Sequence, residues 1–243
     1  IEDGTRTYTI AMERTVVPEN FSFRMTDEEY RVLEKIKNSI PVCYLADHAD
    51  FALGIVTGNN KKFLSAEKTE HSEMVLKGTD ICKYHINPAK QYLRFEPEQF
   101  QQVAPLEIYR APEKLLYRFI SNQLVVAYDD RQMLSLNSCN IVIPKIEGMQ
   151  IKYILAILNS SVSQFVYQKE FHSIKVLRAH MEHIPIPRVG KAIQNEIIAM
   201  TEPLICGMGK EAAETCQKRL DCRIMDLFRL SAEEQWIIRH ALH

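Results

Sequence analysis

LLYRFISNQLVVAYDD, residues 115–130, contains two runs of branched and aromatic residues separated by a polar turn. Short runs of this composition, bounded by turn residues, are typical of β-strands. Similar runs, separated by turn residues, occur from residue 42 to residue 145, in FALGIV (51–56), LEIYR (106–110) and NIVIPK (140–145). Most runs are too close together for the helical crossovers that parallel strands require. The sequence therefore predicts a mixed, mainly antiparallel sheet.

Helical patterns lie on both sides of this region. Thr26 and Glu29 have the spacing of a capping box, which predicts a helix that ends before Pro41. Apolar residues at helical spacing predict one further helix over residues 148–171. The expected class is α+β, a sheet body with packed helices followed by a helical tail.

The tail begins after HIPIPR (183–188), whose prolines exclude a helix interior. Two apolar stripes follow at helical spacing, interrupted near Pro203, and Ser231 with Glu234 caps a last helix. We therefore divide the chain into a linker and helix (1–41), a body (42–188) and a helical tail (189–243).

Composition and charge limit the classes of function. The 243 residues are 46% hydrophobic with a formal net charge of −1, whereas a small autonomous DNA-binding domain usually has a clear basic excess. Residues 168–191 contain five Lys or Arg against two Glu, which fits either a basic contact surface or a solvated face.

Location and context follow from the same composition. Six scattered cysteines without a CxxC pair indicate a reducing, cytoplasmic compartment. No apolar run approaches the ~18 residues of a membrane span, and no signal peptide is recognisable. The start at Ile1 leads us to expect a piece of a longer protein.

GIVTGNNKKF (54–63) is either a phosphate cradle, a grip on a polynucleotide or a hairpin turn. Its glycines lack the spacing of a P-loop, and no G-x-G-x-x-G fingerprint occurs in the chain. HMEH (180–183) lacks the i, i+4 spacing that places two imidazoles on one metal, and Asp129–Asp130 is typical of a turn. We therefore expect no metal site and no catalytic constellation.

Six segments in order resemble the Taq-like C-terminal specificity domain of type II restriction–modification enzymes. This is the target-recognition module of adenine-N6 DNA methyltransferases, and the resemblance extends over about residues 40–190. The segments are GIVTGNNKKF (54–63), LKGTDI (76–81), APEKLLYRFISNQLVVAYDD (111–130), LNSCNIVIP (136–144), YILAILNS (153–160) and KVLRAHMEHIPIP (175–187).

The resemblance implies recognition without catalysis. The glycine-rich S-adenosylmethionine motif and the Asn-Pro-Pro-Tyr motif of such methyltransferases are absent, and INPAK (86–90) keeps only the Asn-Pro. The expected parent is a site-specific DNA adenine-N6 methyltransferase, with or without a fused endonuclease. S-adenosylmethionine would serve that parent, with Mg²⁺ if a nuclease is fused, and this chain would need no cofactor.

The resemblance also implies where double-stranded DNA binds. In the 54–63 loop, backbone amides and Asn side chains would meet phosphates or base edges, and the lysines would neutralise phosphates. Arg118 has an alternative as a half-buried ion-pair partner, and the loop has one as a solvent-exposed hairpin turn. The predicted DNA-contacting residues are Thr57, Gly58, Asn59, Asn60, Lys61, Lys62, Lys77, Arg118, Arg131, Lys175 and Arg178.

Several alternatives remain open from the sequence. The chain could be a specificity subunit of a multi-subunit restriction system, a protein-interaction scaffold, or a nucleotide-binding enzyme domain that uses the 54–63 loop. The expected partners are DNA and the methyltransferase domain of the same polypeptide, with no membrane association. The tail either packs within its own chain or forms a homodimer contact.

Overall fold

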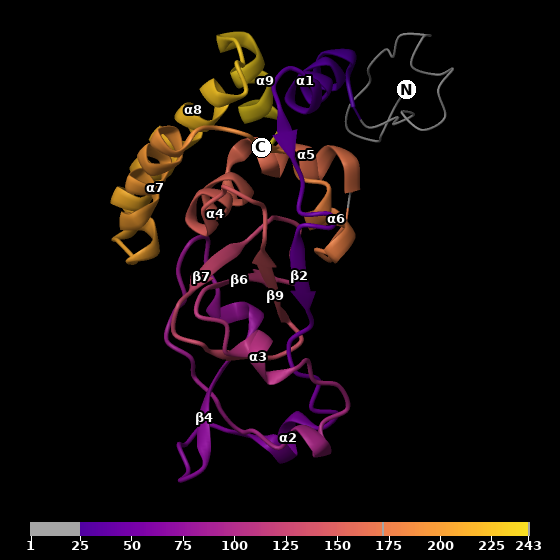
Figure 1. The fold of residues 1–243 in the computed structure, drawn as a ribbon, viewed down its shortest axis with the longest axis vertical. Coiled ribbons are helices and arrows are strands. Elements are labelled where there is room, and N and C mark those ends of the chain that lie inside the picture. Colours follow the sequence, from indigo (N-terminus) through magenta and orange to yellow (C-terminus); the bar gives the residue numbers. More distant parts are fainter. Residues whose placement is uncertain (1–24, 172, 243) are drawn as a thin grey trace, which may run out of the picture.

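The computed structural model describes residues 25–171 and 173–242. The linker predicted for residues 1–22 lies outside them. The molecule has a helical end and a β-rich end, stacked along its longest axis (Figure 1). The three sheets of the described residues are mainly antiparallel and helices occupy the end of the chain, which confirms the predicted α+β class.

A four-stranded antiparallel sheet forms the centre of the molecule, and the stretch 115–130 supplies its hairpin. Leu115 and Leu116 are both fully buried but point to opposite faces, because side chains alternate along a strand. Leu115 packs on the helices and Leu116 packs on a second sheet. In spatial order the strands are β2 (Ala49–Ala52), β9 (Cys139–Pro144), β6 (Lys114–Arg118) and β7 (Val126–Asp129).

The second sheet lies toward the β-rich end, where Figure 1 labels its strand β4. Its pairs are antiparallel except β4 with β8, which is parallel. The order is β3 (Leu64–Ser65), β5 (Tyr92–Arg94), β4 (Ser72–Leu76) and β8 (Leu134–Ser135). Short helical turns connect this layer: α2 (Asn60–Phe63), η3 (Gly78–Asp80), η4 (Pro97–Gln99) and α3 (Leu106–Tyr109).

The helical end covers the other face of the central sheet. The α1 capping box is confirmed, since Glu29 N donates to Thr26 Oγ1 (3.1 Å) and Thr26 N donates to Glu29 Oε2 (2.9 Å). β1 (Val42–Cys43) and β10 (Ile186–Pro187) pair antiparallel as a separate two-stranded sheet. The helices are α1 (Asp27–Asn38), α4 (Ile151–Asn159), α5 (Ser161–Phe171), α6 (Arg178–Glu182), α7 (Lys191–Ile205), α8 (Lys210–Leu227) and α9 (Ala232–Ala241).

Two predicted elements are wrong. LEIYR (106–110) forms the single helical turn of α3 instead of a strand. The helix expected over 148–171 is two helices, because Ser160 is extended (ψ 159°) and its Oγ accepts a hydrogen bond from Ser163 N (3.2 Å). A serine that caps the next turn in this way interrupts an otherwise continuous apolar pattern.

The tail packs back on its own chain. Lys35 of α1 pairs with Glu234 of α9 (2.6 Å), and Lys152 of α4 pairs with Glu202 of α7 (2.7 Å). The predicted capping box at Ser231 is present, and α7 runs through Pro203 to Ile205. Across the part of the chain that the structure describes, no helix combines the length and apolarity needed to cross a membrane.

Candidate nucleic-acid interface

Gly54 places the 54–63 loop at the edge of the central sheet. A Cβ at this position would lie 2.1 Å from Leu136 O and 2.7 Å from Cys139 O, so only glycine fits against that backbone. Gly54 N donates to Asn140 Oδ1 (3.2 Å), and Ile55 forms an isolated parallel bridge with Leu136. The chain therefore leaves β2 and enters the loop from a fixed position.

The loop contains a capped helical turn, so the alternative of a simple hairpin turn is wrong. Asn59 is the N-cap of α2, and its Oδ1 accepts from Lys62 N (3.2 Å). Thr57 is buried, and its Oγ1 accepts from Asn59 N (3.2 Å) and donates to Asn60 Oδ1 (2.6 Å). Gly58 adopts a left-handed conformation (φ 75°), which glycine tolerates best. The Asn-Asn pair thus determines the shape of the loop.

This geometry changes the roles of the polar residues in the loop. The Thr57 hydroxyl is engaged inside the protein. Both Asn59 and Asn60 are exposed, but their Oδ1 atoms accept the hydrogen bonds described above. Bidentate pairing with adenine needs the amide oxygen as well as the NH₂ group, so it would require one of these bonds to break.

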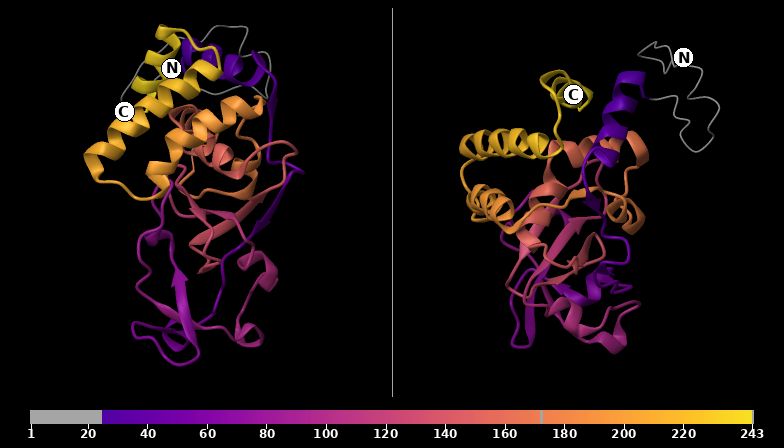
Figure 2. Two further views of the ribbon diagram at one scale, coloured as in Figure 1. Left: turned by 60° about the vertical axis from the view of Figure 1, so that its left-hand side comes forward. Right: turned by 45° about the horizontal axis from the view of Figure 1, so that its top comes forward.

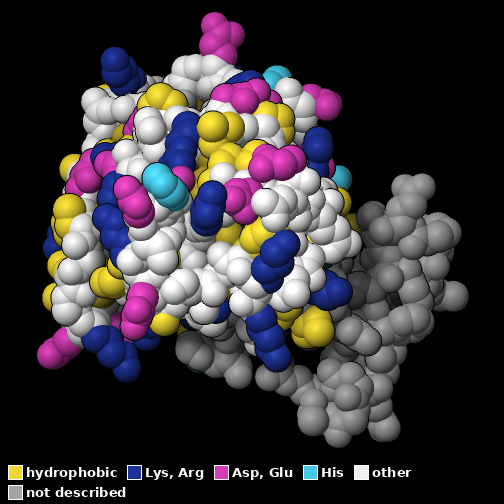
Figure 3. All heavy atoms as spheres, turned by 90° about the horizontal axis from the view of Figure 1, so that it is seen from below, with side chains coloured by type: hydrophobic (Ala, Val, Ile, Leu, Met, Phe, Trp, Pro, Cys, Tyr) yellow, Lys and Arg dark blue, Asp and Glu magenta, His cyan; other side chains and the backbone are white. Residues whose placement is uncertain are grey.

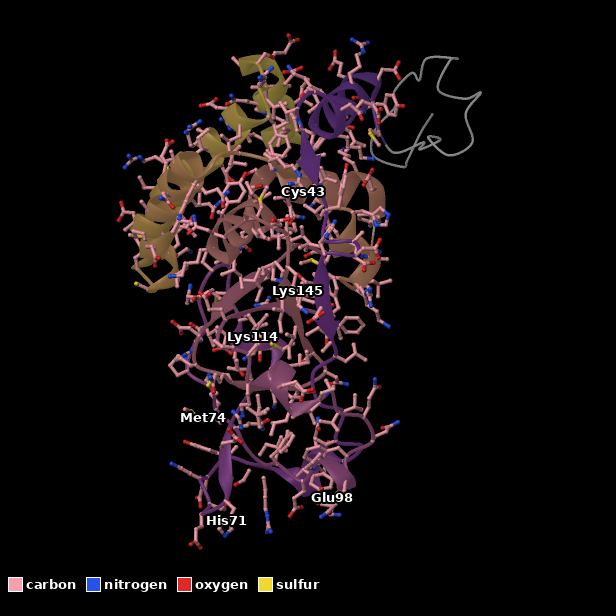
Figure 4. The ribbon with its side chains drawn as sticks, viewed as in Figure 1. Cys43, His71, Met74, Glu98, Lys114 and Lys145 are labelled. Atoms are coloured by element: carbon pink, nitrogen blue, oxygen red, sulfur yellow. The ribbon has the colours of Figure 1, made fainter. Side chains whose placement is uncertain are left out.

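Lys61 and Lys62 are the exposed cations of the loop. Lys62 Nζ donates to Gln99 Oε1 (3.2 Å) and lies 4.7 Å from the centroid of the Phe63 ring. Among the described residues, neither lysine forms an ion pair with a carboxylate, so both can meet phosphates. The acidic Glu98 lies at the same end of the molecule as α2 (Figure 4).

Lys175 and Arg178 form a second exposed group, at and just before α6. The Arg178 guanidinium lies 5.2 Å from the centroid of the Phe51 ring and pairs with Glu182 (2.7 Å). Lys175 Nζ lies 5.9 Å from the centroid of the Phe119 ring. Phe51 belongs to β2, the strand that leads into the 54–63 loop. Arg178 of α6 therefore packs on the strand that positions this loop.

The two groups lie along one side of the molecule. In Figure 1 and in the right-hand view of Figure 2, α6, β2 and α2 follow one another down the same edge. We call this edge the α6–α2 side and define its cations as Lys61, Lys62, Lys175 and Arg178. Seen from the β-rich end, basic side chains lie among acidic ones (Figure 3). This mixture matches the near-neutral net charge.

The remaining predicted contacts differ in availability. Arg118 is half-buried, and its Nε and Nη2 donate to Gly78 O (2.9 Å) and Ile81 O (2.5 Å), so it holds the η3 turn. Its partners are backbone carbonyls, so the ion-pair alternative is wrong. Lys77 precedes that turn and is partly exposed. Arg131 is exposed after β7, where Asp129 Oδ1 accepts from its backbone N (2.9 Å).

The histidines of HMEH have structural contacts. His180 stacks on Phe171 (centroids 4.5 Å apart), and its Nδ1 accepts from Leu177 N (3.2 Å). Burial lowers the pKa of the His180 imidazole. His183 Nδ1 lies 2.6 Å from Ala179 O. These contacts shape α6 and so position Arg178.

Phe51 and Gln99 support the cations and were not predicted. Phe51 supports Arg178 and also contacts the Tyr117 ring edge-on (centroids 6.5 Å apart). Gln99 binds Lys62 across a sequence separation of 37 residues. Neither pairing has a local sequence signal, because each depends on segments that only the fold brings together.

The chain resembles one protein family in sequence and several solved proteins in structure. Residues 73–186 match the model of the TaqI-like C-terminal specificity domain. The type IIL restriction–modification enzyme MmeI, solved in complex with DNA, aligns with a TM-score of 0.57 at 10% identity, over 85% of this chain and 37% of that one. The type IIG restriction endonuclease BpuSI aligns with a TM-score of 0.51 at 11% identity, over 89% and 32%.

These two likenesses show a shared fold, and this chain spans about a third of each of those chains. No curated protein matches the sequence.

Proposed function

We infer that this chain, whose residues 73–186 match the TaqI-like C-terminal specificity domain, is the DNA target-recognition part of a restriction–modification enzyme. The family match carries the inference, and the resemblance read from the sequence agrees with it. The exposed cations of the α6–α2 side supply the kind of surface that such a part needs. The alternative of a nucleotide-binding enzyme gains no support, since Thr57 and Asn59 already satisfy amides of the loop.

The contact surface that we propose is the α6–α2 side. Lys61 and Lys62 would neutralise phosphates at one end, and Lys175 and Arg178 at the other. Neutralised phosphates release counterions, so affinity should fall steeply as salt rises. Arg131 follows β7, at the edge of the central sheet opposite β2, so we leave it out of this surface. Lys77 would add a contact beside the η3 turn, whereas Thr57 and Arg118 would act by holding the loops.

The finer assignment concerns the whole enzyme. We propose that a methyltransferase domain of the same polypeptide provides catalysis with S-adenosylmethionine, in the cytoplasm, and that a fused nuclease would use Mg²⁺. The tail packs on its own chain, so a homodimer contact would have to use its outer face.

Fluorescence anisotropy with labelled duplexes, selected from a random library by this chain, tests the proposal. We expect the paired substitution Lys61→Glu and Lys62→Glu to weaken binding at least about tenfold and to flatten the salt dependence. The matched control is Lys191→Glu with Lys210→Glu, the same charge change at exposed positions of the tail. If the chain enriches no particular sequence from the library, or if both paired variants lose the same DNA affinity, target recognition through this surface is contradicted.

A further inference from the structure

Two adjoining cavities lie between the body and the tail, on the side of the molecule that carries α7 and α8 (Figure 1). One has a volume of about 350 Å³ and the other about 540 Å³, and both are lined by Lys83 and Lys218. In Figure 1 and in the right-hand view of Figure 2, α6 lies on the opposite side. These cavities are therefore separate from the proposed DNA surface.

The smaller cavity has an apolar wall and an unsatisfied polar edge. Leu204, Met208 and Ala213 of the tail line it together with Tyr84 and Gln217. Among the described residues, the buried Tyr84 Oη and Gln217 Nε2 have no hydrogen-bond partner outside this pair. Buried polar atoms with so few partners are costly, so a ligand atom that bonded to this pair would be stabilised.

The backbone holds the Tyr84 phenol in this place. Tyr84 has φ 74°, a left-handed conformation that is uncommon outside glycine. It is fixed there because its N donates to Val126 O (2.7 Å) and its O accepts from Tyr128 N (3.1 Å). The ring is 2% exposed, so its hydroxyl cannot turn to solvent for a partner.

The larger cavity is rich in donors. Lys83, Lys218 and Arg239 bring three positive charges to its walls. Its carboxylate, Asp221, already accepts from Ser161 N and Ser161 Oγ (both 2.8 Å). Among the described residues, none of the three cations has a carboxylate partner within ion-pair distance.

A buried amide adds to this set of donors. Gln164 is 5% exposed, and its Oε1 accepts from Leu124 N (2.8 Å). Its Nε2 has no partner in the described structure. Burial lowers the pKa of the Lys83 ammonium, an effect that Asp221 only partly offsets, so an anion beside Lys83 would stabilise the charged form of this lysine.

From these walls we propose that the paired cavities bind a small organic phosphate with an apolar or aromatic body. The body would occupy the smaller cavity against Leu204 and Met208, and the phosphate would meet Lys83, Lys218 and Arg239 in the larger one. A phosphate has three acceptor oxygens for these cations and the Gln164 amide, more than a carboxylate offers. Such a ligand would join the tail to the body.

Adenosine monophosphate is the probe, and its two halves are the controls. Thermal unfolding and calorimetry of this chain with millimolar adenosine monophosphate should show a raised Tm and saturable binding. Adenosine lacks the phosphate and inorganic phosphate lacks the body, so each should bind at least about tenfold more weakly. Equal binding of inorganic phosphate, or no response to adenosine monophosphate, would overturn the proposal.

Variants locate the site. Lys218→Met, at an exposed position of α8, should abolish the shift without affecting folding, whereas Lys210→Met on the same helix should keep it. Lys83→Met tests the shared wall, and if that variant fails to fold then Lys218→Met decides the question. A shift that survives Lys218→Met contradicts the assignment, and neither outcome bears on DNA binding at the α6–α2 side.

Discussion

Lys114 Nζ lies 2.5 Å from Asp129 Oδ2, and both side chains are fully excluded from solvent. The pair joins the start of β6 to the end of β7, whose register places these two residues opposite each other. Lys114 Nζ also donates to Tyr109 O (2.6 Å), and Asp129 Oδ2 accepts from Met133 N (2.9 Å). Every charge in this buried network is therefore compensated, and the network shapes the turn that carries Arg131.

Lys114→Met should destabilise the protein strongly. It leaves the Asp129 carboxylate buried without its countercharge, which typically costs about 3–5 kcal/mol. Urea unfolding measures the loss. The matched control is Lys145→Met, whose pair with Asp50 (2.5 Å) is exposed and should contribute less than about 1 kcal/mol. Equal losses for the two variants would contradict the role assigned to the buried pair.

Gly54→Ala should reduce stability by about 1–3 kcal/mol or more, because the added methyl group overlaps the backbone of residues 136 and 139. Relief of that overlap moves the start of the 54–63 loop, so DNA affinity should fall as well. Gly190→Ala is the control, since nothing lies within 4 Å of a Cβ there. Urea unfolding and anisotropy together report the two effects. Unchanged stability of Gly54→Ala would show that the contact with Leu136 is not rigid.

Alkaline pH should destabilise the fold through its buried tyrosines. Burial raises the pKa of Tyr117 from 10.0 to about 12, and burial also raises the pKa values of Tyr84 and Tyr153. The folded-state pKa of Tyr117 lies above the unfolded one. The contribution of Tyr117 to the free energy of unfolding is therefore complete below pH 10 and is lost as pH rises from 10.0 to about 12.

Urea unfolding on either side of pH 10.0 measures this slope. Tyr117→Phe removes one titrating group, so its stability should depend less on pH in that window. An identical slope in the variant would assign the alkaline loss to other groups.

The sequence predicted the sheet because strand signals are local. Alternation along residues 115–130 places Leu115 and Leu116 on opposite faces, and only a sheet covered on both sides can bury both. The capping boxes at Thr26 and Ser231 are local as well, and both are present. The strand predicted for LEIYR (106–110) was wrong because the single helical turn after Pro105 is too short to show the helical period of apolar residues.

Charged sites were harder to predict than the fold. The exposure of Lys61 and Lys62 follows from the polar residues before them in the sequence. The side chains that support these lysines and Arg178 have no such local signal. Phe51 reaches Arg178 and Gln99 reaches Lys62 only through tertiary packing. The hydroxyl of Thr57 looks available in the sequence, and only the fold shows that the cap of α2 uses it.

Arg178 provides the sharpest test of the DNA surface, because its partner Glu182 restrains it. Arg178→Ala should weaken duplex binding and reduce the salt slope by about one, the change expected for a lost phosphate contact. Glu182→Gln removes the competing carboxylate 2.7 Å away and should tighten binding instead. Controls are Arg219→Ala and Glu211→Gln, exposed positions of α8 on the opposite side.

Anisotropy over a series of salt concentrations separates the outcomes. Opposite shifts for Arg178→Ala and Glu182→Gln, with both controls unchanged, are expected if the Arg178 guanidinium contacts phosphate. Because Arg178 also stacks on Phe51, a purely structural role would lower the Tm of Arg178→Ala and leave the salt slope intact. A salt slope equal to that of the unsubstituted protein would therefore remove α6 from the DNA surface.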